Sequence, residues 1–169
     1  MSPKNALTLS IGVLAVIAVW VTAEIITVPV WVVFIAWASF FFLGAGPRGL
    51  VQSLASNLTG IAIASLCLLV IQQAALGTWM TGVVVGVGSA LMVAVSRLKL
   101  IATIPAIVLG FASTVGTSAV TGQMITYPHV QNPVLIVVTA MVLGAAFGYA
   151  SDWLATKITT RTQTIEVTV

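Results

Sequence analysis

The sequence predicts an all-α integral membrane protein with six transmembrane helices, and three observations support this class. First, 60% of its 169 residues are hydrophobic and 5% are charged, against about a quarter charged in an ordinary soluble domain. Second, the apolar residues form six runs, each close to the roughly 20 residues that cross a bilayer core. Third, the basic residues occupy alternate ends of these runs. A water-soluble fold is therefore excluded.

The expected helices follow from the apolar runs and from the residues that interrupt them. The runs are 7–23, 28–43, 50–71, 79–95, 100–120 and 133–155. Pro29 and Pro133 stand at the starts of the second and sixth runs, where a missing N–H costs little. Residues 44–49 and Gly77 break the chain on either side of the third run. Pro105 falls inside the fifth run and predicts a kink there, because it removes one helical hydrogen bond.

The basic residues set the expected topology. All six lie on one side of the predicted membrane, and they are Lys4, Arg48, Arg97, Lys99, Lys157 and Arg161. Short loops rich in Lys and Arg stay in the cytoplasm, so we expect cytoplasmic N- and C-termini. Residues 1–155 form the single transmembrane domain in this interpretation. Residues 156–169, which are rich in Thr, are expected to be a cytoplasmic and partly disordered tail.

The tryptophans are consistent with this map, with one exception. Four of them fall near predicted interfaces, and they are Trp20, Trp31, Trp79 and Trp153. Indole rings favour that depth, because the ring is half buried there while its N–H meets water. Trp37 instead falls near the middle of the second run. Its N–H therefore needs an internal partner or a polar cavity.

The two halves of the chain resemble each other faintly. Residues 36–39 are similar to 110–113, and 60–62 are similar to 144–146. A repeat of three helices inverts its second copy, an architecture that places binding sites near the midplane of many transporters. Two inverted three-helix repeats and a chance likeness of small residues both remain open.

Polar residues gather on one face of the fifth run and on one face of the third. Thr103, Gly110, Thr114 and Thr117 follow one another at steps of seven, four and three residues, so they share a helix face. Asn57 is expected to point inward, because an amide in hydrocarbon must be hydrogen-bonded. These faces either line a solute pathway or hydrogen-bond between helices and to the i−4 carbonyl. The candidate pathway residues are Trp37, Asn57, Thr103, Gly110, Thr114 and Thr117.

Glycines four residues apart predict close contacts between helices. The pairs are Gly82 with Gly86 and Gly144 with Gly148. Asp152 lies one turn after the second pair, at the predicted cytoplasmic rim. We expect it to form an ion pair there with one of three cations, namely Arg97, Lys99 or Lys157.

The sequence lacks the residues that several function classes need. The predicted midplane carries no charged residue or histidine, which disfavours ion-coupled transport. Paired carboxylates, metal-ligand clusters, phosphate-binding loops and nucleophile–base pairs are all missing. We therefore expect no enzyme, no catalytic residue, no metal and no cofactor. The scattered cations also argue against nucleic-acid binding.

Several small and aromatic motifs resemble one known family. They are Trp31 with Phe34, Gly49-Leu50, Pro105 with 110–112, and 143–149. The chain is similar, from Trp31 to Trp153, to the YcdZ-like family of bacterial inner-membrane proteins, domain of unknown function 1097. Ala106 stands where that family has a glycine. The resemblance implies a compact protein of about six helices in the bacterial inner membrane, with no settled activity.

Two functions remain open at this level. The first is a membrane channel or facilitator for a small neutral or weakly polar solute. The second is a non-transporting membrane scaffold or accessory subunit, in which the polar faces only join helices. In both, the partners are the lipid bilayer and further copies of the chain, because so small a bundle leaves little room for a pore within one copy.

Overall fold

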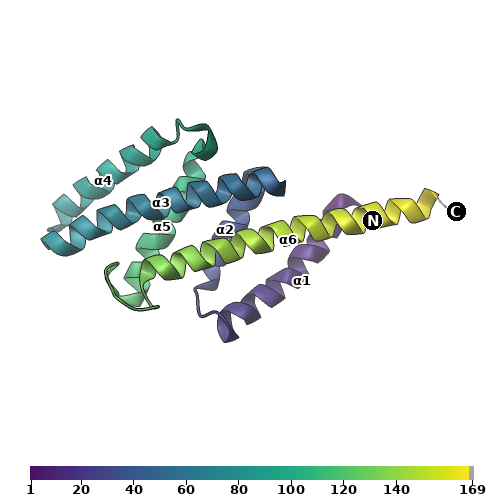
Figure 1. Cartoon of the computed structure of the whole chain (residues 1–169), viewed down its shortest axis with the longest axis horizontal. Helices are drawn as coiled ribbons and strands as arrows, with labels where there is room; N and C mark the ends of the chain where they lie inside the picture. Colours follow the sequence, from purple (N-terminus) through teal and green to yellow (C-terminus); the bar gives the residue numbers. More distant parts are fainter. Residues whose placement is uncertain (168–169) are drawn as a thin grey trace.

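The computed structural model describes the backbone of residues 1–167 and the side chains of residues 1–159. Within this part of the chain it contains six α-helices and one short 3₁₀ helix (Figure 1). The elements are α1 (Pro3–Glu24), α2 (Val30–Phe42), α3 (Gly46–Ala74), α4 (Thr78–Val95), η1 (Lys99–Ile101), α5 (Ile104–Thr121) and α6 (Pro133–Val167). No strand occurs within this range. The all-α class predicted from the sequence is confirmed.

Five of the described helices are long and apolar enough to cross a membrane. These are α1, α3, α4, α5 and, over Pro133–Thr159, α6. The exception is α2, whose 13 residues span only about 20 Å at 1.5 Å per residue. The chain is therefore a multi-pass membrane protein. The run 28–43 is expected to form one of six full-length spans, but α2, which forms there, is shorter than a full-length span.

The ends of α2 explain why it is short. Pro29 precedes its first turn as the N-cap, with an extended backbone. At the other end Gly44 has a φ of 90° and Ala45 a φ of 57°. The amide of Ala45 donates to the carbonyl of Phe40, and that of Gly44 to the carbonyl of Phe41. This is the Schellman arrangement that terminates a helix.

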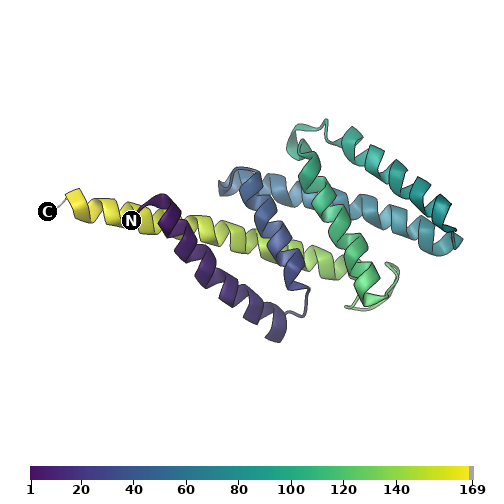
Figure 2. The ribbon, with the colours of Figure 1, turned by 180° about the vertical axis from the view of Figure 1, so that it is seen from behind.

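The helices interlock across the middle of the molecule. In Figures 1 and 2, α3 and α6 run antiparallel through the centre, α2 and α5 cross them, and α1 and α4 lie at opposite edges. The most extensive packing joins α3 to α5 and α2 to α6, and α1 also packs on α6. The second helix of each half of the chain thus packs mainly on the third helix of the other half.

Two ends of this bundle can be told apart by charge. Successive α-helices run in alternate directions, and the N-terminus lies beside the C-terminal part of α6 (Figure 1). We call this the basic end, because Lys4 and Arg48 lie in the first turns of α1 and α3. The connections 25–29, 75–77 and 122–132 at the other end contain no Lys or Arg. We call it the Lys/Arg-free end.

The predicted kink at Pro105 is wrong. Pro105 lies in the first turn of α5, after Thr103 as the N-cap. The first helical hydrogen bonds run from the amides of Ala106 and Ile107 to the carbonyl of Thr103. A proline in this position interrupts no ladder, because its N–H would have had no partner. The helix expected to begin at residue 100 therefore begins at Ile104, after the 3₁₀ turn η1.

The last helix also differs in length from the prediction. It was expected to end at residue 155, yet α6 continues to Val167. The backbone of the tail that the sequence predicts to be partly disordered is therefore helical through Val167, and residues 168–169 lie outside the described residues.

Candidate functional site

Buried polar side chains gather where α2, α3 and α5 meet. Their exposed fraction is zero at seven positions, which are Ser39, Ser53, Ser56, Asn57, Ser113, Thr114 and Thr117. We call them the central polar cluster. The surrounding helix surfaces are apolar, and burying a polar group without a hydrogen bond costs free energy. Such a cluster therefore needs either internal partners or a ligand.

Part of the cluster is satisfied within the protein. The hydroxyl of Ser39 donates to the Oδ1 atom of Asn57 over 3.2 Å. The hydroxyl of Thr114 donates to the carbonyl of Gly110, four residues earlier, over 2.9 Å. The amide oxygen of Asn57 thus links α2 to α3. The prediction that Asn57 points inward is confirmed.

Four buried polar atoms of the cluster have no hydrogen-bond partner among the described residues. They are Ser56 Oγ, Asn57 Nδ2, Ser113 Oγ and Thr117 Oγ1. Leaving a buried donor or acceptor unpaired costs about 1–3 kcal/mol for each group. Their free donors and acceptors could hydrogen-bond a small polar molecule that reaches this depth.

The polar faces of α3 and α5, whose relation the sequence leaves open, pack directly on each other. A Cβ atom added at Gly60 would meet the carbonyl oxygen of Ile107 and would lie 2.7 Å from the amide nitrogen of Phe111. One added at Gly110 would meet the backbone carbonyl of Asn57. At this crossing the two backbones are in contact, and no channel separates them.

The four predicted packing glycines fall into two environments. A Cβ at Gly144 would meet the carbonyl oxygen of Val33, and one at Gly148 would lie 2.8 Å from the ring of Phe40. These two positions join α6 to α2. Gly82 and Gly86 have no atom within 4 Å of such a Cβ, so both face open space on α4.

Trp37 is buried in an aromatic stack rather than exposed to a cavity. Its ring lies 5.8 Å from that of Phe34 and 5.6 Å from that of Phe147. Its Nε1–H donates to the Oγ atom of Ser151 over 3.0 Å. Of the two alternatives that the sequence leaves open for the indole N–H, an internal partner or a polar cavity, the structure has the partner. Ser151 itself was missed, although it lies one turn after Gly148 on α6 and so faces α2.

Thr103 lies apart from the central polar cluster. As the half-buried N-cap of α5 it makes no side-chain capping hydrogen bond. Its distance along the helix from Thr114 is about 16 Å, at 1.5 Å per residue. Of the six predicted pathway residues, Asn57 and Gly110 are in contact at the α3–α5 crossing. Thr114 and Thr117 follow one and two turns further along α5, Trp37 lies on α2, and Thr103 lies at the basic end.

Asp152 has a different partner from the expected cation. Its Oδ2 atom accepts a hydrogen bond from the backbone amide of Gly46 over 3.2 Å. Gly46 is the first residue of α3, so the carboxylate caps that helix and also faces the positive end of its dipole. The predicted rim ion pair is replaced by a link between α6 and α3.

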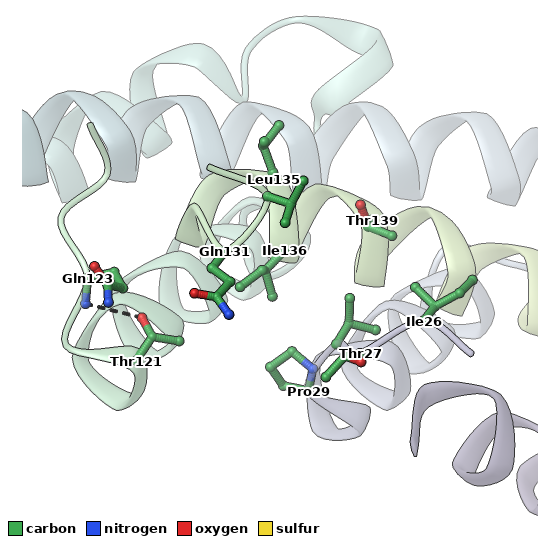
Figure 3. Close-up of a pocket in the computed structure, with 11 residues that line it drawn as sticks. Ile26, Thr27, Pro29, Thr121, Gln123, Gln131, Leu135, Ile136 and Thr139 are labelled. Atoms are coloured by element: carbon green, nitrogen blue, oxygen red, sulfur yellow. Dashed lines mark hydrogen bonds between the residues drawn. The ribbon is translucent and has the colours of Figure 1, made fainter. Parts of the chain in front are cut away.

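A cleft of about 1030 Å³ opens at the Lys/Arg-free end. Its lining residues come from the connection before α2, the end of α5, and the start of α6 with the loop before it. They are Ile26, Thr27, Val28, Pro29, Thr121, Gln123, Val130, Gln131, Leu135, Ile136 and Thr139. Figure 3 shows Thr121 and Gln123 on one side, Thr27 and Pro29 on the other, and the amide of Gln131 between them.

Two side-chain amides hold the loop that forms one wall of this cleft. The Oε1 atom of Gln72 accepts from the amide of Ile125 over 3.1 Å, while the Nδ2 atom of Asn132 donates to the carbonyl of Ile125. Gln72 also donates to the hydroxyl of Ser118. Sequence reasoning missed both amides. The one available signal was their uncharged polar character next to helix ends.

One family comparison covers nearly the whole bundle. The family described as protein of unknown function (DUF1097) matches residues 8–156. The chain belongs to the DUF1097 family. No curated protein and no solved structure matches it. In this DUF1097 chain the described residues contain no group of three or more His, Cys, Asp or Glu side chains that could hold a metal.

Proposed function

We propose that this DUF1097 chain admits a small neutral or weakly polar solute to the interior of the bundle and lets it cross the membrane. The observation that carries the proposal is the set of four unpartnered polar atoms in the central polar cluster. Hydroxyl and amide groups can replace the hydration of an uncharged solute. An ion would find no counter-charge at this depth, so the solute is uncharged.

Hydroxyls lead from the cleft toward the cluster along one face of α5. Thr121 lines the cleft, and Thr117 and Ser113 follow it inward at steps of four residues. Residues four apart on a helix are neighbours on its surface. Thr117 and Ser113 are both fully buried, and both hydroxyls lack a partner within the described residues. We take this column as the route, with Asn57, Gly110, Thr114 and Trp37 around its inner end.

Passage requires α3 and α5 to separate, because Gly110 and Asn57 are in backbone contact. We propose that the chain consists of two inverted three-helix repeats that rock against each other, as repeat units do in many transporters. The glycine contacts support this. Aligning 36–39 with 110–113 pairs Val33 with Ile107, and aligning 60–62 with 144–146 pairs Gly60 with Gly144. Each of these glycines lies against the paired carbonyl of the other half.

The membrane context is part of the same proposal. The basic end would face the cytoplasm, since Lys and Arg favour that side, and the membrane would be the bacterial inner membrane. The chain would act as a homo-oligomer.

A second candidate is a scaffold or accessory subunit without transport. The backbone contacts at Gly60, Gly110 and Gly144 favour it, because small residues that bring backbones together are typical of static helix packing. In this interpretation the bond from Ser39 to Asn57 joins α2 to α3, and the hydroxyl of Thr114 is already satisfied within α5. The four unpartnered atoms would then only lower stability.

Flux measurements on conservative variants separate the two candidates. Purified protein in liposomes is challenged with urea or glycerol, and the volume change is followed by stopped-flow light scattering. We expect faster equilibration than in protein-free liposomes, slowed severalfold by Thr117→Val or Ser113→Ala. Ser89→Ala is the matched control, because that hydroxyl lies on exposed α4 and bonds only to the carbonyl of Val85.

The scaffold candidate makes a prediction about stability as well. Removing an unpaired hydroxyl from a static scaffold should stabilise it by about 1 kcal/mol or more, with no effect on flux. If liposomes that contain the wild-type protein equilibrate their volume no faster than protein-free liposomes with either solute, the transport proposal is overturned.

A further inference from the structure

We propose that the cleft at the Lys/Arg-free end is a binding site for an uncharged amphiphilic molecule. This ligand has an apolar body and one group, such as a carboxamide, that both donates and accepts hydrogen bonds. Binding there does not depend on the transport proposed above, because it requires no movement of α3 against α5.

Besides the side chain of Gln123, three polar side chains of the cleft are available to a ligand. The hydroxyls of Thr27 and Thr139 and the amide of Gln131 make no hydrogen bond within the described residues. In Figure 3 the Gln131 amide lies between the two sides of the cleft, with Thr139 and Thr27 to the same side of it. A carboxamide and two hydroxyls both donate and accept, so they suit a ligand group that does the same.

Six of the other eight lining residues are apolar, and the remaining two are Thr121 and Gln123. Figure 3 places Leu135 and Ile136 near Gln131, Pro29 between Gln131 and Thr27, and Ile26 beyond Thr27. Burying apolar area contributes about 25 cal/mol for each Å² removed from water. The volume of about 1030 Å³ lies just above the roughly 300–1,000 Å³ typical of small-molecule sites. A ligand with a substantial hydrocarbon part therefore fits.

Charge decides the ligand class. None of the eleven described lining residues is charged. An anion or cation would lose hydration in the cleft without gaining a counter-charge. A purely apolar molecule would desolvate the Gln131 amide and the threonine hydroxyls without replacing their hydrogen bonds. A neutral molecule with a hydrogen-bonding group avoids both penalties.

The site is preformed rather than created by the ligand. Gln72 and Asn132 fix the backbone of Ile125 from both sides, and the backbone N–H of Gln123 donates to the hydroxyl of Thr121 over 3.4 Å. A wall that is already ordered costs less free energy on binding than a loop that must be ordered.

The test uses four probes of similar shape that differ in charge and polarity, namely benzamide, benzoate, benzylammonium and toluene. Saturation-transfer NMR on the full chain in lipid nanodiscs, after subtraction of protein-free nanodiscs, reports binding. We expect saturable binding of benzamide and none of the other three. Gln131→Leu and Thr139→Val should each weaken benzamide binding roughly fivefold to tenfold, as the loss of one hydrogen bond implies.

Two further variants keep the test decisive. Gln73→Leu is the control, because Gln73 is an exposed glutamine at the same end of the bundle that does not line the cleft. Gln131→Glu should reverse the preference, so that benzylammonium binds and benzamide binds weakly. Equal binding of all four probes, binding of none, or unchanged benzamide binding in the Gln131 variants would each overturn the proposal.

Discussion

Gly60→Ala is the substitution that probes the helix crossing most directly. The added Cβ would meet the carbonyl oxygen of Ile107, and it would lie 2.7 Å from the amide nitrogen of Phe111 and 2.9 Å from the carbonyl carbon of Ile107. All three atoms belong to the backbone of α5. No side chain can rotate away to make room, so α3 and α5 must move apart.

The size of the effect follows from these distances. Carbon atoms in ordinary contact lie about 3.5–4.0 Å apart, so the helices must separate by roughly 1 Å. A gap of about 0.5–1 Å removes roughly a quarter to a half of the attractive energy of each dispersion contact along the crossing. Overpacking typically destabilises a protein by about 1–3 kcal/mol. We expect a cost of about 3 kcal/mol, at the upper end, because the obstacle is backbone.

Gly82→Ala provides the matched control. This glycine also lies inside a helix, but a Cβ there would have no atom within 4 Å. Alanine favours a helix over glycine by about 1 kcal/mol, and this gain is common to both variants. The difference in unfolding free energy between Gly60→Ala and Gly82→Ala therefore isolates the packing cost.

Reversible unfolding in mixed detergent micelles, followed by circular dichroism, measures this difference. We expect Gly60→Ala to be less stable than Gly82→Ala by about 3 kcal/mol. Gly144→Ala should lose a similar amount, since its Cβ would meet the carbonyl of Val33. If Gly60→Ala proves as stable as Gly82→Ala, the described contact between α3 and α5 is refuted.

Two further predictions concern the hydrogen bonds that hold α6. Ser151→Ala removes the partner of the Trp37 N–H and should destabilise the protein by about 1–3 kcal/mol. In a Trp37→Phe background the same change should destabilise the protein clearly less. An equal loss of stability in both backgrounds would contradict the pairing. Asp152→Ala removes the acceptor of the Gly46 amide and should destabilise the protein by about 1 kcal/mol. Hydrogen exchange in the first turn of α3 should then be faster. Asp152→Asn keeps an acceptor and should retain most of the protection from exchange. Unchanged exchange in Asp152→Ala would rule out the cap.

Features encoded by composition and local pattern could be predicted from the sequence. The apolar runs predict the helices, and the polarity of Asn57 and the depth of Trp37 predict that both side chains turn inward. Each inference rests on a solvation penalty that depends on one residue and its position in one run. The same penalty explains why both predictions are confirmed.

Features that depend on two distant segments could not be predicted in this way. Pro105 stands within a continuous apolar run, and hydropathy does not reveal the 3₁₀ turn that places it at the start of α5. The acceptor of the Trp37 N–H and the partner of Asp152 both depend on how α6 crosses the other helices. The cleft is built from three separate segments, and no local pattern marks them as neighbours.

The burial of Trp37 has a consequence for spectroscopy. Its exposed fraction is 3%, whereas those of the other four tryptophans run from 39% for Trp31 to 82% for Trp79. Collisional quenchers such as acrylamide or brominated lipids would quench the fluorescence of the four exposed tryptophans. The emission of the buried Trp37 would remain. That residual fluorescence, present in the unlabelled wild-type chain, would report continuously on whether α2 and α6 remain in contact.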